Sequence, residues 1–145
     1  MAKSTFKISA EGMDGLTIKC QAREFEITID EPVEAGGNNK GMTPVEALLI
    51  GLASCKAIVV KAFVRKYKIN LNSVKVECEG VLDTDGFMGK NPDAKIGFSE
   101  ITTHYYIDAD NTDEELEEYL KFVEINCPVK DTIVNAPEMT HQLHR

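Results

Sequence analysis

The sequence contains no tryptophan, only five prolines and three histidines among its 145 residues. It lacks the run of roughly 18 apolar residues that suggests a membrane-spanning helix. Its first residues do not form the hydrophobic segment of a signal peptide. The histidines and cysteines do not have the spacing of a metal site, and there is no Cys-x-x-Cys motif, phosphate loop or dinucleotide fingerprint. We therefore expect a cytoplasmic protein without a metal, bound cofactor or membrane attachment.

The net charge and the length of the chain exclude further classes of protein and indicate a single domain. A formal net charge of −8 argues against binding to nucleic acid or to an anionic membrane. The length suits a single domain, residues 1–145, whose core needs no disulfide. In a reducing compartment, the four cysteines are expected to be reactive or buried rather than bridged. Cys20 and Cys78 fall on the apolar side of alternating segments, so we expect them in the core.

Alternating apolar and polar residues predict several strands, and two further segments have helical periodicity. The expected strands cover residues 6–10, 16–22, 25–29, 74–82 and 101–107, with a final strand in the tail 138–145. The first three form an antiparallel meander with one buried face. A helix begins after Thr112, and a short helix begins at Cys127 and stops near Pro137. This order of elements predicts an α+β fold.

The longest helix is expected from Thr43 to about Lys68. Thr43, Pro44 and Glu46 form a capping box with proline in the first turn. Residues 45–60 are apolar on nearly every side, so the helix should be enclosed on most sides. One small sheet cannot enclose it, which is a first indication of a second layer or a second subunit.

Cys55 and Cys127 are the strongest candidate functional residues because they occupy contrasting helical settings. Cys55 lies inside the apolar helix, one turn after Gly51, which allows another element to approach closely. Cys127 precedes Pro128 and should be an N-cap, where backbone N–H groups and Lys130 are expected to lower its thiol pKa. A sheltered and an activated cysteine together suggest a dithiol redox couple. A plainer interpretation also stays open, in which Cys55 is an inert core residue.

Glu46 and Arg23 are weaker candidates. Glu46 is a possible catalytic carboxylate, although the capping box already explains its presence. It precedes Cys55 by nine residues, which is about 13.5 Å of helical rise, so the two cannot touch on one helix. A shared site would need a dimer interface. Arg23 follows the second expected strand and either faces solvent or pairs with a thiolate.

The chain resembles the superfamily of osmotically inducible protein C and organic hydroperoxide resistance protein (OsmC/Ohr). The matching segments are residues 30–32, 36–37, 41–49, 51–55 and 127–129. The resemblance implies an intertwined homodimer with antiparallel sheets around long central helices. It also implies thiol-dependent reduction of organic hydroperoxides, in which Cys55 attacks the peroxide and Cys127 resolves the product. An external dithiol of the dihydrolipoyl type is the implied reductant, with no bound cofactor.

Two positions depart from the pattern of the dedicated peroxidases. Val45 stands where their catalytic glutamate directly follows the helix-opening proline, and Glu46 comes one residue later. Arg23 is only the nearest match to their arginine, and Lys40 precedes the helix. The sequence therefore resembles the OsmC-like branch more closely. Ligand binding or redox sensing without peroxidase turnover are the alternative functions.

Overall fold

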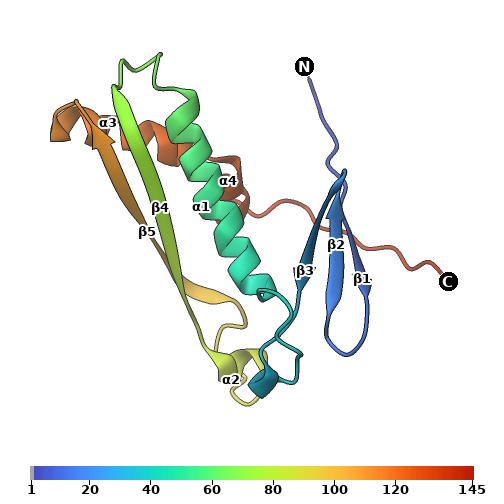
Figure 1. Ribbon diagram of the computed structural model, residues 1–145. Coiled ribbons are helices and arrows are strands. Elements are labelled where there is room, and N and C mark those ends of the chain that lie inside the picture. Colours follow the sequence, from blue (N-terminus) through green and yellow to red (C-terminus); the bar gives the residue numbers. More distant parts are fainter. Residues whose placement is uncertain (1) are drawn as a thin grey trace. The chain divides into compact units, whose positions relative to one another are not determined.

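The computed structural model describes residues 2–145, which form two compact units divided between Leu48 and Leu49. The first unit contains a three-stranded sheet, and the second contains a two-stranded sheet and helices (Figure 1). Helix α1 (Pro44–Ala62) runs across the point of division. Helices and antiparallel strands in this order confirm the predicted α+β class.

The first unit is an antiparallel meander of β1 (Ser9–Gly12), β2 (Ile18–Ala22) and β3 (Phe25–Ile29), as predicted. The first strand begins at Ser9 rather than at Phe6, whose side chain is 91% exposed. The register explains the late start, because Ser9 pairs with Gln21 and β2 ends one residue later. The following residue, Arg23, has a φ of 54° and turns the chain into β3. Residues before Ile8 therefore have no strand to pair with.

The meander does not bury one face as expected. Ile29 is buried, whereas Phe25 and Ile27 on the same strand are about half exposed. Besides the strands, residues 2–48 contain only the 3₁₀-helix η1 (Val33–Ala35) and the start of α1. A sheet needs another layer to bury its apolar face, and these short segments supply little apolar surface.

Asp30 organises the loop that leads from β3 to α1. Its side chain is buried and accepts hydrogen bonds from the Thr17 hydroxyl at 2.8 Å and from the backbone N–H of Glu31 at 2.8 Å. The backbone N–H groups of Asn38 and Lys40 donate to the same carboxylate at 3.3 and 3.2 Å. Burial raises the pKa of the Asp30 carboxyl, but these four donors together outweigh it and hold the pKa below its ordinary value.

The same loop requires two glycines because the backbone passes very close to itself. A Cβ atom at Gly37 would overlap the backbone carbonyl of Glu31, and one at Gly41 would overlap that of Thr28. Only glycine, which has no Cβ atom, fits at either position without a shift of the backbone. The Asp30 hydrogen bonds and these contacts together fix the segment before α1.

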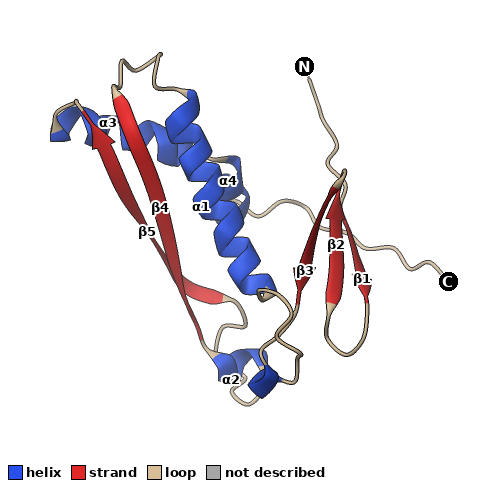
Figure 2. Ribbon diagram, viewed as in Figure 1, coloured by secondary structure: helices blue, strands red, loops and turns tan. Residues whose placement is uncertain are grey.

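The second unit packs helices on a long antiparallel hairpin. β4 (Leu71–Leu82) pairs with β5 (Phe98–Ala109), and the connection contains the short α2 (Thr84–Phe87). α3 (Asp113–Ile125) and α4 (Pro128–Val134) follow (Figure 2). The buried core joins α1, the loop before β4 and α3 through Val59, Val60, Ile69, Tyr119 and Val123. Within this core the Tyr119 hydroxyl donates a hydrogen bond to the Val60 carbonyl at 2.6 Å.

The beginning of α1 matches the prediction, but its end does not. The Thr43 hydroxyl accepts from the Glu46 N–H at 3.2 Å, and the Glu46 carboxylate accepts from the Thr43 N–H at 2.9 Å, which is the predicted capping box. The regular helix ends at Ala62 rather than near Lys68.

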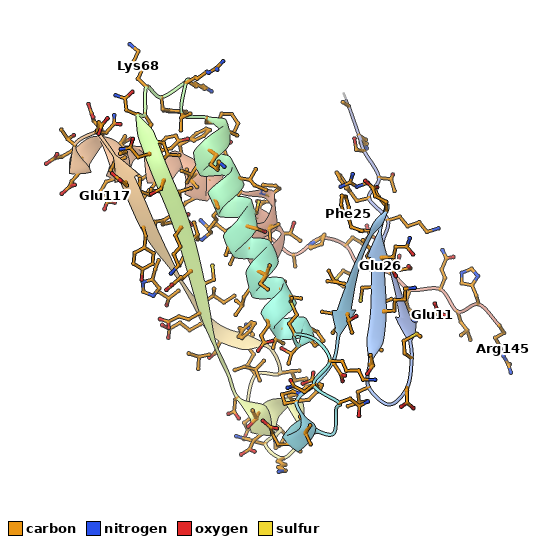
Figure 3. All side chains as sticks on the ribbon, in the orientation of Figure 1. Glu11, Phe25, Glu26, Lys68, Glu117 and Arg145 are labelled. Atoms are coloured by element: carbon orange, nitrogen blue, oxygen red, sulfur yellow. The ribbon has the colours of Figure 1, made fainter. Side chains whose placement is uncertain are left out.

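Residues 63–68 continue as turns, and a C-capping motif closes them. The N–H of Ile69 bonds to the carbonyl of Val64, and the N–H of Lys68 bonds to that of Arg65. With a φ of 55° at Lys68, this is the pattern of a Schellman motif. The Lys68 side chain projects outward from this turn (Figure 3). The predicted helix end near Lys68 is therefore the end of the capped turns, six residues beyond Ala62, where the regular helix ends.

The chain buries one face of α1. Leu52, Lys56, Val59 and Val60 are buried at helical spacing, whereas Ile50 and Ile58 are exposed. The expected enclosure on most sides is therefore not provided by this single chain. The second subunit stays a prediction.

The predicted helices after β5 are present, but the predicted last strand is wrong. Thr112 and Glu115 form the second capping box at the start of α3. Residues 138–145 form no strand, because none of the described strands makes backbone hydrogen bonds with them. No helix among residues 2–145 is long and apolar enough to cross a membrane.

Replacing Asp30 with asparagine should lower the melting temperature by several degrees at neutral pH, because Thr17 and three backbone donors lose a charged acceptor. The lowered folded pKa means that the carboxylate stabilises the fold above its unfolded pKa. That contribution is lost as the pH falls through the folded pKa. Thermal denaturation from pH 7 to pH 3 should therefore show the difference from wild type shrinking in acid. Asp14→Asn, an exposed change in the same unit, is the control; equal losses in both variants would contradict the assignment.

Candidate functional site

Cys127 is the N-cap of α4, as the sequence predicts. Its sulfur accepts a hydrogen bond from the backbone N–H of Lys130 at 3.4 Å, and Pro128 occupies the first helical position. The residue is almost fully buried, with 1% of its surface exposed. α4 thus presents an oriented N–H group to a sulfur that is shielded from water.

The structure brings Cys55 next to Cys127, although 72 positions of sequence separate them. Cys55 on α1 is partly buried and lies close enough to Cys127 to raise the pKa of its thiol. Both are free thiols, as are Cys20 and Cys78. The latter two are partly exposed rather than in the buried core. Of the four cysteines, Cys55 and Cys127 are therefore the pair whose contact supports dithiol chemistry.

The N–H groups at the N-cap act on the Cys127 pKa in the predicted direction, but the predicted net lowering of that pKa is wrong. Burial is the largest influence and raises the pKa of the Cys127 thiol. The Lys130 N–H acts in the opposite direction, whereas the neighbouring Cys55 thiol raises the pKa further. The sequence correctly indicates the helix N-terminus but not the loss of hydration around the sulfur. In this structure Cys127 is a buried thiol that stays protonated at neutral pH.

A network of charged side chains lies between the segments that carry the two cysteines. The Lys56 ammonium is buried, and its Nζ lies 2.9 Å from Glu124 Oε1 and 2.7 Å from the Thr103 hydroxyl. Lys130 Nζ lies 3.2 Å from Glu124 Oε2, and the Tyr105 hydroxyl donates to Glu124 Oε1. Glu124 thus accepts from three side chains on three different elements.

The pKa values follow from these contacts. Burial raises the pKa of the Glu124 carboxyl, but the hydrogen bonds from Tyr105, Lys56 and Lys130, with the charge of Lys56, outweigh it and lower the pKa. Burial and the adjacent Glu124 carboxylate raise the pKa of Tyr105. Glu124 is therefore ionised and Tyr105 is a neutral donor at neutral pH. Two ammonium groups face one carboxylate in this network.

The network borders a cavity of about 400 Å³ in the second unit. Its walls include the apolar Leu52, Ile101 and Ile133 and the charged Lys56, Glu124 and Lys130. A protein with a net charge of −8 therefore has a small cavity whose charged side chains sum to one positive charge. Such a site combines apolar walls with a few fixed polar groups, as small-molecule sites do.

The structure does not place a charged partner for Cys55 at Glu46 or Arg23. Glu46 is exposed and engaged in the capping box with Thr43. The Arg23 guanidinium lies 5.0 Å from the centre of the Phe25 ring and 3.9 Å from Glu24, on the exposed β2–β3 turn. Their catalytic roles stay predictions.

Three residues of this network, Glu124, Tyr105 and Thr103, have no local sequence pattern that marks them as site residues. Lys56 gave the only signal, because a lysine in an apolar helix must find an anion when it is buried. The sequence does not show which of many acidic residues meets it. Among residues 2–145 there is no group of three or more His, Cys, Asp or Glu side chains arranged to hold a metal ion.

Comparisons with known proteins identify relatives of the chain as a whole. The family model described as OsmC-like protein matches residues 37–142. A hydroperoxide reductase of Mycoplasma genitalium is 31% identical over 88% of this chain and 86% of its own length. A second hydroperoxide reductase, from Mycoplasma pneumoniae, is 28% identical over 80% of this chain and 77% of its own length.

Solved structures share the fold. The OsmC-like protein of Mycoplasma pneumoniae has a TM-score of 0.81 and 26% identity, covering 93% of this chain and 91% of its own. An organic hydroperoxide resistance protein OsmC from Legionella pneumophila has a TM-score of 0.66 and 19% identity, with 93% of both chains covered. These two likenesses span nearly the whole of residues 1–145.

The raised pKa of Cys127 predicts that its alkylation by iodoacetamide reaches half of its maximal rate at a pH above the ordinary thiol value, because the thiolate is the reacting form. The reduced protein is alkylated between pH 6 and pH 10.5, and the cysteine-containing peptides are quantified by mass spectrometry. Cys20, on the exposed meander, serves as the internal standard for the reagent. A Cys127 midpoint below the ordinary value would show that the N–H of Lys130 outweighs burial.

Proposed function

The chain belongs to the OsmC-like protein family, and on that premise we propose that it reduces organic hydroperoxides with the thiols of Cys55 and Cys127. The observation that carries the proposal is the proximity of these two thiols, one of which is the N-cap of α4. Relatives named hydroperoxide reductase support the same reaction class. The protein thus acts in the detoxification of peroxides during oxidative stress.

The reaction balances with two thiols and one external dithiol. The Cys55 thiolate attacks the terminal peroxide oxygen, the O–O bond breaks, and the alkoxide takes a proton to leave as an alcohol. Cys55 is now a sulfenic acid. The Cys127 sulfur attacks the Cys55 sulfur, forming the disulfide and releasing the hydroxyl as water. An external dithiol then reduces the disulfide to two thiols and is itself oxidised to a disulfide.

The environment of Cys127 suits the second step. Its raised pKa keeps it protonated, so the less buried Cys55 is the thiol that meets peroxide first. As Cys127 attacks and negative charge develops on its sulfur, the Lys130 N–H is already oriented to stabilise that charge. The helix N-terminus therefore assists resolution rather than the initial attack.

The remaining partners follow from the family resemblance. The reductant is a dithiol of the dihydrolipoyl type, and neither a metal nor a bound cofactor takes part. The working form is a cytoplasmic homodimer, which also supplies a partner for exposed apolar residues on α1 such as Ile50 and Ile58. Glu46 and Arg23 assist the attack by Cys55 across that dimer, because α1 separates Glu46 from Cys55 by about 13.5 Å of rise.

Ligand binding without turnover is the second candidate function. The cavity of about 400 Å³ beside Lys56, with apolar walls and net positive charge, favours it. An acyl ligand with an anionic end has the matching chemistry. Binding would then be saturable and would consume no reductant.

Turnover is tested by the consumption of dihydrolipoamide with cumene hydroperoxide. Wild-type protein and Cys78→Ser should both turn over. Cys55→Ser should lose essentially all activity, because the attacking sulfur is absent. Cys127→Ser should form the Cys55 sulfenic acid once and turn over far more slowly. Folded wild-type protein with free thiols and no turnover would refute the peroxidase and leave ligand binding.

Glu46→Gln tests the catalytic role of the carboxylate. Glutamine keeps the acceptor for the Thr43 N–H, so the melting temperature should stay close to wild type. If the charge assists peroxide attack, kcat/KM should fall by roughly ten- to a hundredfold. Glu115→Gln makes the matching change in the capping box of α3 and should leave activity unchanged. Wild-type activity in Glu46→Gln would refute the catalytic role and leave Glu46 with the capping role alone.

A further inference from the structure

One ion pair joins the two segments that carry the reacting cysteines. Lys56 directly follows Cys55 on α1, and Glu124 precedes Cys127 by three residues near the end of α3. Their charged atoms lie 2.9 Å apart, and the Lys56 side chain is only 5% exposed. The backbone of each cysteine is therefore a short distance along the chain from one end of this bond.

Lys130 makes a second connection on the α4 side. Its Nζ lies 3.2 Å from the other oxygen of Glu124, while its backbone N–H donates to the Cys127 sulfur. The same residue thus touches both the carboxylate and the thiol. Because α4 has only seven residues, this side-chain contact anchors a large part of it. Glu124 consequently restrains the helix start that orients Cys127.

The sheet fixes the orientation of the network. From β5, the Tyr105 hydroxyl donates to Glu124, and the Thr103 hydroxyl accepts from Lys56 at 2.7 Å. Among the described residues, every buried side-chain nitrogen or oxygen has a hydrogen-bond partner. Lys56 is the buried member of this network, and removing Glu124 would leave its charge without an anionic partner.

We propose that Glu124 is a positioning residue for disulfide formation, holding the Cys127 sulfur against Cys55 through its bonds to Lys56 and Lys130. Glu124 does not touch the peroxide or exchange protons with the sulfurs in this role. It raises the fraction of time that the two sulfurs spend at reacting distance, on which the rate of an intramolecular step depends steeply. This inference rests on the proposed function, in which Cys127 resolves the oxidised Cys55.

The first test separates sulfenic acid formation from its resolution. Reduced Glu124→Gln is oxidised with one equivalent of cumene hydroperoxide in the presence of dimedone, and mass spectrometry counts dimedone adducts and Cys55–Cys127 disulfides. Sulfenic acid should form at the wild-type rate, whereas the disulfide should form about tenfold more slowly. The trapped fraction should rise accordingly. Glu118→Gln is the matched control, because it removes the same charge from the exposed side of α3.

The second test needs no peroxide. Wild type and both variants are equilibrated in glutathione redox buffers, and the ratio of disulfide to dithiol gives the effective concentration of one thiol near the other. Glu124→Gln should lower this concentration by about tenfold, and Glu118→Gln should not change it. If the wild type does not react with peroxide but forms the disulfide in these buffers, the proposed function is refuted. The comparison of Glu124→Gln with wild type in the same buffers then still decides the positioning role. A wild type that forms no Cys55–Cys127 disulfide would overturn the positioning role.

Stability is measured alongside, because a merely structural role predicts a different result. A Glu124→Gln variant with a lower melting temperature but wild-type values in both assays would overturn the proposal. If that variant does not fold, Lys130→Met decides, since its side chain is partly exposed and its backbone N–H stays on Cys127. It should slow disulfide formation several-fold relative to Lys121→Met, its exposed control on α3. Equal rates in these two lysine variants would likewise refute it.

Discussion

The ion pair between Lys56 and Glu124 joins the two parts of the chain on which the proposed chemistry depends. A buried ammonium is costly unless an anion and further acceptors surround it, and here Glu124 and the Thr103 hydroxyl provide them. In satisfying Lys56, the fold also fixes the end of α3 against α1. Cys127, three residues beyond Glu124, is carried to Cys55 by the same contact. An electrostatic requirement and a geometric one are therefore met by a single carboxylate.

The two thiols differ in their surroundings in a way that suits successive steps. Cys127 is buried with a raised pKa, whereas Cys55 is more accessible. A thiol that stays protonated is a poor target for peroxide and avoids over-oxidation. It reacts when the neighbouring sulfur becomes electrophilic and the N–H of Lys130 stabilises the developing charge. The order of the proposed steps thus follows from the burial of Cys127 and from the raised pKa that this burial causes.

Membership of the OsmC-like family and the solved structures that share the fold agree with the arrangement of sheets and helices. Val45 follows Pro44 in the first turn of α1, and Glu46 forms the capping box with Thr43. The cavity beside Lys56 is lined by two lysines and one glutamate. Activity measurements on the variants above therefore examine this chain's own residues, beyond what its relatives imply.

The sequence by itself determined the α+β order of elements, the capping boxes at Thr43 and Thr112, and the N-cap position of Cys127, because these depend on neighbours within a few residues. Lys56 directly follows Cys55 as a charged residue in an otherwise apolar helix, but no local pattern identifies an ion-pair partner for it. Only the tertiary structure decided that the partner is Glu124 and that Cys127 has a raised rather than a lowered pKa. The pairing of Lys56 and the pKa of Cys127 both depend on which distant segments exclude water from the side chain. Patterns among neighbouring residues do not determine which segments those are.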